Sequence, residues 1–323
     1  MRLSPSEKME IIRIVEQSEL GVVRTLKELG VHPSTFYNWY ARNFEEGYEG
    51  LKPCPKQQRR FWNQIPPKER QRVVEIALDK PELSPRELAH HITDKHGWFI
   101  SESSVYRILK ERGLVTSPAH IVMSASDSFK DKTTRVNQMW QTDFTYMKVM
   151  GWGWCYLSTI LDDYSRYIIH WELCDSMKYQ DVERCVSHAL EKTGLVKNKR
   201  PKLLSDNGPC YRSSELREYL DNTGIRHING APNHPQTQGK IERYHRSMKN
   251  VVKLDVYFSP DELRYRLNEF VEYYNNKRYH ESLQNLTPAD VYSGRDHEIL
   301  EKRKMIKKKT MRKRKIYYQK QLA

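Results

Sequence analysis

Three acidic residues stand in polar motifs that lie far apart in the sequence and are suited to metal binding. Asp143 lies in Trp-Gln-Thr-Asp-Phe-Thr-Tyr, Asp206 in Leu-Leu-Ser-Asp-Asn-Gly and Glu242 in Gly-Lys-Ile-Glu-Arg-Tyr-His, with 35 residues between the last two acids. Hard divalent cations such as Mg²⁺ prefer oxygen ligands. Two such ions about 4 Å apart can hold the attacking and leaving oxygens of a phosphodiester exchange. If the three carboxylates meet in the fold, they predict an enzyme that cuts and rejoins DNA.

The stretch around Glu242 has the period of an amphipathic helix. Four polar residues recur at i, i+3, i+4 and i+7 and share one face: Glu242, His245, Arg246 and Lys249. Four apolar residues form a second face that we expect to be buried: Ile241, Tyr244, Met248 and Val252. An acid that binds metal, followed by basic groups on one helix face, suits DNA that passes over metal ions. The candidate DNA contacts in this stretch are Lys240, Arg243, His245, Arg246 and Lys249.

Other residues with metal-binding side chains have plainer interpretations. Asp162 and Asp163 form a further acidic pair, which we interpret as solvated carboxylates in a hairpin between two strands. His90, His91 and His96 lie close together in sequence but lack the cysteines of a usual structural zinc site. We therefore interpret these three histidines as surface residues and expect no zinc.

The charge distribution indicates a polyanionic partner. The 323 residues carry a formal net charge of +14 at pH 7, with an isoelectric point near 9.4. Residues 302–323 contain 11 Lys and Arg and no acid, which leaves a charge of only +3 on the rest of the chain. The basic excess is thus concentrated in a tail, which we expect to be disordered without a partner and to contact DNA phosphates.

The cysteines and the hydropathy pattern indicate a reducing compartment. The five cysteines are scattered, which favours free thiols: Cys54, Cys155, Cys174, Cys185 and Cys210. We find no signal-peptide pattern and no run of 18 apolar residues. We therefore expect a cytoplasmic protein, associated with the nucleoid in a bacterium, and no membrane partner.

Residues 1–45 have the pattern of a helix-turn-helix domain. Three helices are expected, beginning near residue 6, at Val22 and at Pro33, and Gly30 ends the second of them. Three aromatic residues at i, i+3 and i+4 should face the core: Phe36, Trp39 and Tyr40. The candidate DNA contacts on the outward face are Ser34, Thr35, Tyr37, Asn38 and Arg42.

The three-helix pattern recurs in residues 67–113, with linkers on either side. Helices are expected at residues 67–78, 85–95 and 103–112, and Ser84 and Glu87 have the spacing of a capping box. The candidate DNA contacts here are Ser103, Ser104, Arg107 and Lys110. We interpret the polar segments at residues 46–66 and 114–137 as linkers between domains.

From residue 138 to residue 293 the pattern changes to that of an α/β domain. Strands are expected at residues 140–146, 154–161, 166–173, 202–204 and 225–228. Helices are expected at residues 179–192, 213–222, 238–252 and 260–277. Three consecutive strands followed by alternating helices and strands indicate a mixed sheet flanked by helices.

The polar motifs of this region, taken together, resemble the core of integrase-like transposases of bacterial insertion sequences, which belong to the retroviral integrase superfamily. The motifs that carry the resemblance are Trp140-Gln-Thr-Asp143, Leu161-Asp-Asp-Tyr-Ser-Arg166, Ser205-Asp-Asn-Gly208, His234-Pro-Gln-Thr-Gln-Gly-Lys-Ile-Glu242, Tyr273-Tyr-Asn-Asn-Lys-Arg-Tyr-His280 and Leu286-Thr-Pro-Ala289. With the two preceding helix-turn-helix domains, the resemblance covers nearly the whole chain except the basic tail at residues 294–323.

The resemblance implies a ribonuclease H-like catalytic domain over residues 138–293. It implies that Asp143, Asp206 and Glu242 are the catalytic and metal-binding acids of the DDE motif, which hold two Mg²⁺ ions or Mn²⁺ as a substitute. It also implies binding of double-stranded DNA at the terminal inverted repeats, cleavage at the 3′ ends and strand transfer into target DNA, by a homodimer or larger oligomer. The zinc domain of retroviral relatives is not carried over, because the N-terminal region lacks its two His and two Cys.

Two other functions remain open for the same residues. A ribonuclease H-like DNA nuclease would hydrolyse DNA but would not join it. A non-catalytic DNA-binding regulator would keep the helix-turn-helix domains and use the core only as a scaffold. Only the transfer of a DNA 3′ end into a second DNA molecule distinguishes a transposase from both.

Overall fold

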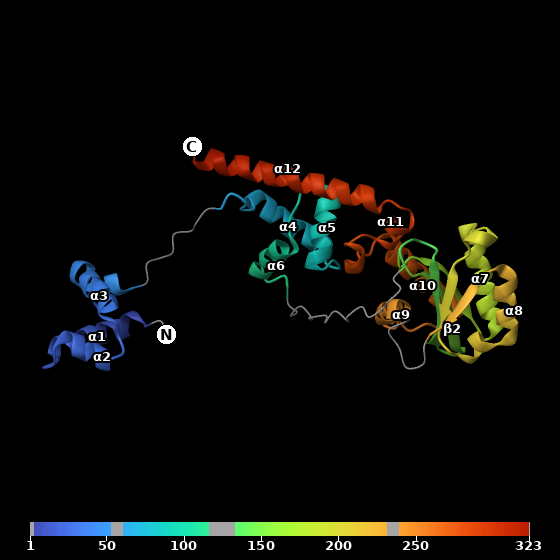
Figure 1. Cartoon of the computed structure of the whole chain (residues 1–323), viewed down its shortest axis with the longest axis horizontal. Coiled ribbons are helices and arrows are strands. Elements are labelled where there is room, and N and C mark those ends of the chain that lie inside the picture. Colours follow the sequence, from blue (N-terminus) through green and yellow to red (C-terminus); the bar gives the residue numbers. More distant parts are fainter. Residues whose placement is uncertain (1–2, 53–60, 116–132, 231–238, 323) are drawn as a thin grey trace. The chain divides into compact units, whose positions relative to one another are not determined.

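The computed structural model describes residues 3–52, 61–115, 133–230 and 239–322 (Figure 1). Cys54 and residues 234–238 of the motif before Glu242 lie outside the described residues. The chain divides into two compact units, Met1–Phe61 and Trp62–Ala323. In the described parts of both units, none of the helices combines the length and apolar character that crossing a membrane requires.

The first unit is a bundle of three helices with the predicted starting points. Its elements are α1 Pro5–Gln17, α2 Val22–Glu28, α3 Pro33–Glu46 and the 3₁₀ helix η1 Gly47–Leu51. Leu26 and Phe36 are buried in its core, and Trp39 packs against that core. Tyr40 stacks on Phe36 but stays exposed, so its expected burial is wrong. Leu51 is also buried in this core, so η1 belongs to the unit and not to a linker that begins at residue 46.

The second unit begins with another three helices, as the recurring pattern predicts. They are α4 Pro67–Asp79, α5 Pro85–His96 and α6 Glu102–Glu111. The amide of Glu87 donates to Ser84 Oγ at 3.3 Å and the amide of Ser84 donates to Glu87 Oε2 at 3.0 Å, which confirms the capping box. Val105, Ile108 and Leu109 of α6 are buried among these helices.

A five-stranded mixed sheet forms the centre of residues 139–229. Its strands are β1 Met139–Val149, β2 Gly153–Asp162, β3 Ile168–Cys174, β4 Lys202–Ser205 and β5 Arg226–Asn229, in the order β3-β2-β1-β4-β5. β2 pairs antiparallel with β1 and β3, whereas β4 pairs parallel with β1 and β5. Each predicted strand is present, with bounds that differ by at most three residues from the expected ones.

Helices cover both faces of the sheet (Figure 1). They are α7 Tyr179–Thr193, α8 Ser214–Thr223, α9 Gly239–Val252 and α10 Pro260–Asn276. Trp140 and Leu203 pack with α7 and α8, whereas Met147 packs with α9 and α10. Because alternate strand residues point to opposite faces, Asp143 shares the face of Met147, on which α9 lies.

The C-terminal tail is a helix, so the expectation of disorder is wrong. Short elements precede it: η2 Lys197–Lys199, η3 Pro209–Arg212, η5 Glu281–Leu283 and α11 Pro288–Tyr292. The tail helix, α12, spans Asp296–Leu322 and runs along α4 and α5 (Figure 1). Arg303 Nε donates to Asp94 Oδ1 at 2.8 Å, and Arg314 Nη2 donates to Glu69 Oε2 at 2.9 Å. Lys and Arg are good helix formers, and these ion pairs hold the helix on the domain that precedes the sheet.

Candidate active site

The pairing of β1 with β4 brings Asp143 and Asp206 to neighbouring positions. Gln141 is the parallel partner of Leu204. This is the last pair of the β1–β4 ladder, and Asp143 and Asp206 each follow it by two residues, Asp206 directly after the end of β4. Neighbouring strands lie about 4.8 Å apart, so the ladder brings the backbones of the two segments close together just before the two acids.

A buried phenol on the α7 and α8 side of the sheet lies near both acids. The hydroxyl of Tyr211, in η3, lies 3.5 Å from Thr142 Oγ1. Burial raises the pKa of Tyr211 well above its usual value, and the negative charges of Asp143 and Asp206 raise it further. Asp206 Oδ1 accepts a hydrogen bond from the amide of Gly208 at 2.9 Å, while the residue as a whole stays exposed. The turn after β4 therefore fixes one oxygen of an acid that faces solvent.

Two polar contacts fix the first turns of α9 to β1, and Glu242 lies between them in the sequence. The amide of Ile241 donates to Gln141 Oε1 at 3.1 Å, and His245 Nδ1 lies 3.3 Å from Asp143 Oδ2. Ile241 and His245 are buried, whereas Glu242 is exposed. The helix therefore crosses the part of β1 that carries Asp143, and its acid lies one turn before the histidine that contacts Asp143.

The ligand types of this acidic cluster (Asp143, Asp206 and Glu242) fit a hard divalent cation. All three residues offer carboxylate oxygens, the ligands that Mg²⁺ prefers. In the described structure they do not form a group whose ligand atoms all lie within 4.8 Å of one another. At least one of these side chains must therefore move before the three can share an ion.

An internal ion pair holds the start of α9 and corrects two expectations. Lys240 Nζ donates to Asp163 Oδ2 at 2.5 Å and to the backbone carbonyl of Asp163 at 2.9 Å. Gln141 Nε2 donates to Asp163 Oδ1 at 2.7 Å. Asp163 is thus buried and paired, so its interpretation as a solvated carboxylate is wrong. Lys240 is bound inside the domain instead of extending from the helix toward DNA.

Asp162 is buried as well, and its role is structural. Asp162 Oδ2 accepts from the amide and the hydroxyl of Ser165 at 2.8 and 2.6 Å, and Asp162 Oδ1 accepts from the amide of Asn137 at 2.7 Å. Burial raises the pKa of Asp162, against the opposite effect of these hydrogen bonds. The predicted turn between β2 and β3 is present, but its two acids are buried and stabilise the fold through these contacts.

The candidate DNA contacts of the two helical domains lie largely on exposed surfaces. On α3 all five are exposed: Ser34, Thr35, Tyr37, Asn38 and Arg42. On α6 three are exposed, namely Ser103, Arg107 and Lys110, and Ser104 is half-buried. Their part in DNA binding stays a prediction.

The basic residues of α9 divide into two groups. Arg243 and Arg246 are exposed, and Lys249 is half-buried with its Nζ 5.2 Å from the ring centre of Tyr146. His245 is buried against Asp143, so the expectation that it faces DNA is wrong. Helical spacing places His245 on the same face as Glu242, but the side of the helix at His245 is covered by the sheet.

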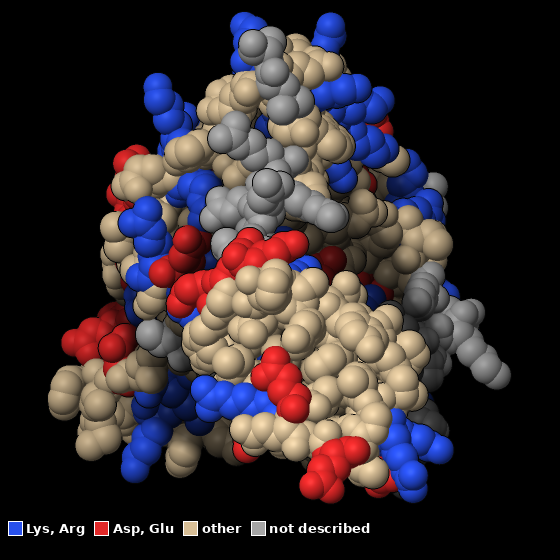
Figure 2. All heavy atoms as spheres, turned by 90° about the vertical axis from the view of Figure 1, so that its left-hand side faces the viewer, with Lys and Arg blue, Asp and Glu red and all other residues tan. Residues whose placement is uncertain are grey.

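The exposed face of α12 is strongly basic. Lys and Arg side chains gather in the upper part of the view in Figure 2, where Figure 1 shows α12. Its exposed members include Lys302, Lys304, Lys308, Lys309, Arg312 and Lys313. The phosphate contact expected of the tail stays a prediction, now for an ordered helix.

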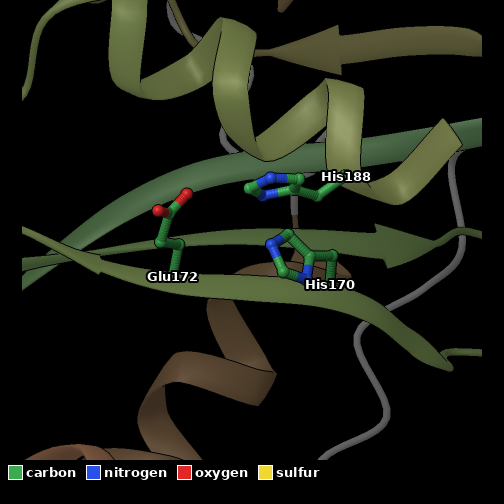
Figure 3. Close-up of side chains that lie close together, drawn as sticks. All are labelled: His170, Glu172 and His188. Carbon is green, nitrogen blue, oxygen red and sulfur yellow. The ribbon is translucent and has the colours of Figure 1, made fainter. Parts of the chain in front are cut away.

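A further cluster of metal-capable side chains was missed from the sequence. His170 and Glu172 of β3 and His188 of α7, here called the histidine cluster, each place a ligand atom within 4.8 Å of the others (Figure 3). Within the described ranges no other set of three or more His, Cys, Asp or Glu meets this criterion. The His-x-Glu spacing on a strand is a weak signal, because the packing of α7 on β3 alone brings His188 close.

Three family models match parts of the chain. Residues 133–235 and 223–288 match models described as integrase core domains, and residues 35–109 match a homeodomain-like domain. The first integrase core match contains Asp143 and Asp206, and the second contains Glu242.

Individual relatives match parts of the chain. The chain is 29% identical over 147 residues to the putative transposase InsK for insertion sequence element IS150 of Escherichia coli, covering 45% of this chain and 51% of that protein. It is 28% identical over 117 residues to the Gag-Pro-Pol polyprotein of Mason-Pfizer monkey virus, covering 36% of this chain and 6% of the polyprotein. The chain thus spans at most about half the length of these curated relatives.

Solved structures with a similar arrangement include the HTLV-2 integrase catalytic core domain in complex with magnesium. The TM-score is 0.40 at 19% sequence identity, over 49% of this chain and 97% of that one. A simian T-cell lymphotropic virus intasome in complex with the PP2A regulatory subunit B56 gamma gives a TM-score of 0.43 at 18% identity, over 68% of this chain and 74% of that one.

Proposed function

We propose that this chain, whose residues 133–288 form an integrase core domain, is a DNA transposase of an insertion sequence. The observation that supports the proposal is the β1–β4 pairing, which ends two residues before Asp143 and Asp206, together with the contact of His245 on α9, the helix of Glu242, with Asp143. The homeodomain-like helices before the core are of a kind that holds DNA. A transposase needs both parts on one chain, a domain that binds the transposon end and a domain that exchanges phosphodiester bonds.

Asp143, Asp206 and Glu242 would hold two Mg²⁺ ions, with Mn²⁺ as a substitute. Such ions, when bound, polarise a phosphodiester and activate the attacking oxygen. The chain's own contribution is to fix the acids. The β1–β4 ladder would hold the segments that carry Asp143 and Asp206, and the contact of Ile241 with Gln141 would hold the turn that carries Glu242.

Two phosphodiester exchanges would take place at this site. In the first, water attacks a phosphodiester at a transposon end, the bond from phosphorus to the 3′ oxygen breaks, and a 3′-hydroxyl is freed. In the second, this 3′-hydroxyl attacks a phosphodiester of target DNA, and a target 3′-hydroxyl leaves. Each exchange forms one P–O bond and breaks one, so neither a Ser or Tyr nucleophile nor a covalent protein–DNA intermediate is required.

Residues 1–113 would recognise the terminal inverted repeats. The exposed residues of α3 and α6 include Asn38 and Arg107, whose amide and guanidinium groups suit the edges of adenine and guanine. Arg243 and Arg246, exposed on α9 beside the acidic cluster, would bind phosphates near the scissile bond. Two transposon ends must be held together, so we expect the active form to be a homodimer or a larger oligomer on DNA.

Strand transfer on oligonucleotide duplexes with the cognate end tests the proposal. Wild-type protein with Mg²⁺ should release a labelled 3′ end and join it to a second DNA molecule. Asp143→Asn and Glu242→Gln should reduce both reactions to background, because each removes a metal ligand. Glu218→Gln changes an exposed carboxyl group on α8, on the other side of the sheet, and should react like wild type.

Three outcomes would contradict parts of this proposal. Joining that survives Asp143→Asn would show that the acidic cluster is not the active site. Cleavage without joining under all conditions would identify a nuclease. DNA binding without cleavage, and without Mg²⁺ or Mn²⁺ binding in calorimetry, would identify a regulator.

A further inference from the structure

We propose that the histidine cluster binds a divalent transition metal ion, zinc above all, at a site separate from the acidic cluster. The proposal does not depend on the chain being a transposase. His170 and Glu172 occupy alternate positions of β3 and lie on the side of that strand where α7 presents His188 (Figure 3). β3 is an edge strand, and β2 separates it from the strand that carries Asp143.

Two atoms of the cluster that could bind a metal are buried and have no hydrogen-bond partner in the part of the chain that the structure describes. His170 Nε2 and Glu172 Oε2 have no hydrogen-bond partner among the described residues. Buried polar atoms almost always have a hydrogen-bond partner. Two such atoms without a partner in one cluster therefore point to a bound ligand. Glu172 Oε1 accepts from Arg184 Nε at 2.7 Å, which anchors the carboxylate by one oxygen and leaves the other for an ion.

The ligand types select the metal. Two imidazoles and one carboxylate form a set that suits zinc, with a fourth position left for water. Mg²⁺ prefers oxygen ligands alone. Zinc bonds of about 2.0–2.1 Å place tetrahedral ligand atoms roughly 3.4 Å apart. The three ligand atoms lie within 4.8 Å of one another, so small side-chain rotations are enough to close the site.

Lys192, which stands next to the cluster, opposes metal binding. Its Nζ lies 3.0 Å from His170 Nδ1, and Arg184, His188 and Lys192 follow one another along α7 at four-residue spacing. A positive charge at this distance repels a metal ion. The side chain of Lys192 is exposed and can turn into solvent. Removal of its charge should therefore tighten metal binding, whereas loss of a ligand should weaken it.

A surface groove runs past the two cluster residues of β3, and His188 is not part of its lining. Its lining includes His170, Glu172 and Lys192, together with Asp261 and Arg264 of α10. A bound ion would join the edge strand β3 to α7. Because an ion that binds only the folded state stabilises it, zinc should also raise the melting temperature of the protein.

Calorimetric titration of the metal-free full-length chain with ZnCl₂, in excess Mg²⁺, tests the proposal. Wild type should bind one zinc ion that His188→Ala and Glu172→Gln weaken at least tenfold, since even partners outside the ligand set commonly change metal affinity 10–100-fold. Lys192→Met should bind zinc more tightly than wild type. With CoCl₂ as a probe, the wild type should show the visible absorption of tetrahedral Co²⁺, and His188→Ala should not.

Two control variants separate this site from the rest of the chain. His297→Ala removes an exposed histidine of α12 and should bind zinc like wild type. Asp143→Asn should also keep the zinc site, even when strand transfer is lost. The proposal is overturned if wild type takes up no zinc or if Glu172→Gln and His188→Ala both bind it unchanged. If His188→Ala does not fold, Lys192→Met still decides, because a merely structural cluster predicts no gain in affinity.

Discussion

The acidic cluster and the histidine cluster lie on the same sheet but are assembled in different ways. The acidic cluster takes its members from β1, from the turn after β4 and from α9, so contacts between distant segments must align them. The histidine cluster takes its members from one edge strand and the helix packed on it, and its ligand atoms already lie within 4.8 Å of one another. The acidic cluster does not meet that limit in the described structure.

This difference shows what each cluster depends on. Two polar links join α9 to β1, formed by Gln141 with Ile241 and by His245 with Asp143, and a third joins Lys240 to Asp163 after β2. The links are buried or half-buried, so each carries a desolvation cost that only its partner offsets. The histidine cluster rests on the apolar packing of α7 against the sheet, and its surrounding ion pairs are partly exposed. Equivalent substitutions should therefore have unequal effects at the two clusters.

The two clusters should differ most in how a substitution of lysine by methionine changes the free energy of unfolding. Lys240→Met should lower the free energy of unfolding by about 3 kcal/mol, because it leaves the buried carboxylate of Asp163 without its cation. Lys192→Met in metal-free protein should change it by at most about 0.5 kcal/mol, because that side chain is exposed. Urea unfolding followed by circular dichroism measures both. Equal losses would show that the link through Lys240 does not govern the stability of the acidic face.

The strands and most helices were predictable because their signals are local. Alternation of apolar and polar residues in β1, and the capping box at Ser84, depend on neighbours in sequence. The three acids stand out by their motifs, since acids are rare in strands such as the one that holds Asp143, and their joint metal site stays a prediction.

Other features depend on partners that lie far away in the sequence. Buried Asp163 is paired with Lys240, and α12 is held by Asp94 on α5 and Glu69 on α4. A run of Lys and Arg has the same composition whether it is disordered or docked, so composition alone predicts the wrong state for α12. The histidine cluster was missed for the same reason, because His188 meets β3 only through tertiary packing.

The two clusters should differ less in how a substitution of histidine by alanine changes the rate of strand transfer. His245→Ala should reduce strand transfer roughly 10–100-fold, in line with partners that orient metal ligands, because its Nδ1 lies 3.3 Å from Asp143 Oδ2. His188→Ala should leave the rate unchanged. The reaction of His245→Ala should also require more Mg²⁺, and His245→Asn, whose amide can still donate to the carboxylate, should recover part of the loss. An unchanged Mg²⁺ requirement would mean that His245 only supports packing.

The smallest expected difference is in DNA affinity and its salt dependence, when an arginine beside each cluster is replaced by glutamine. Arg246 is exposed on α9 and is expected to bind one phosphate, so Arg246→Gln should weaken binding to all duplexes alike and lower the slope of log K against log salt concentration by about 1. Arg184 is held by Glu172 and Asp181, so Arg184→Gln should leave both affinity and slope unchanged. Fluorescence anisotropy with cognate and scrambled duplexes over a salt series measures the pair. If the two variants give the same slope, DNA does not pass over the exposed side of α9, and the path assigned to it beside the acidic cluster is wrong.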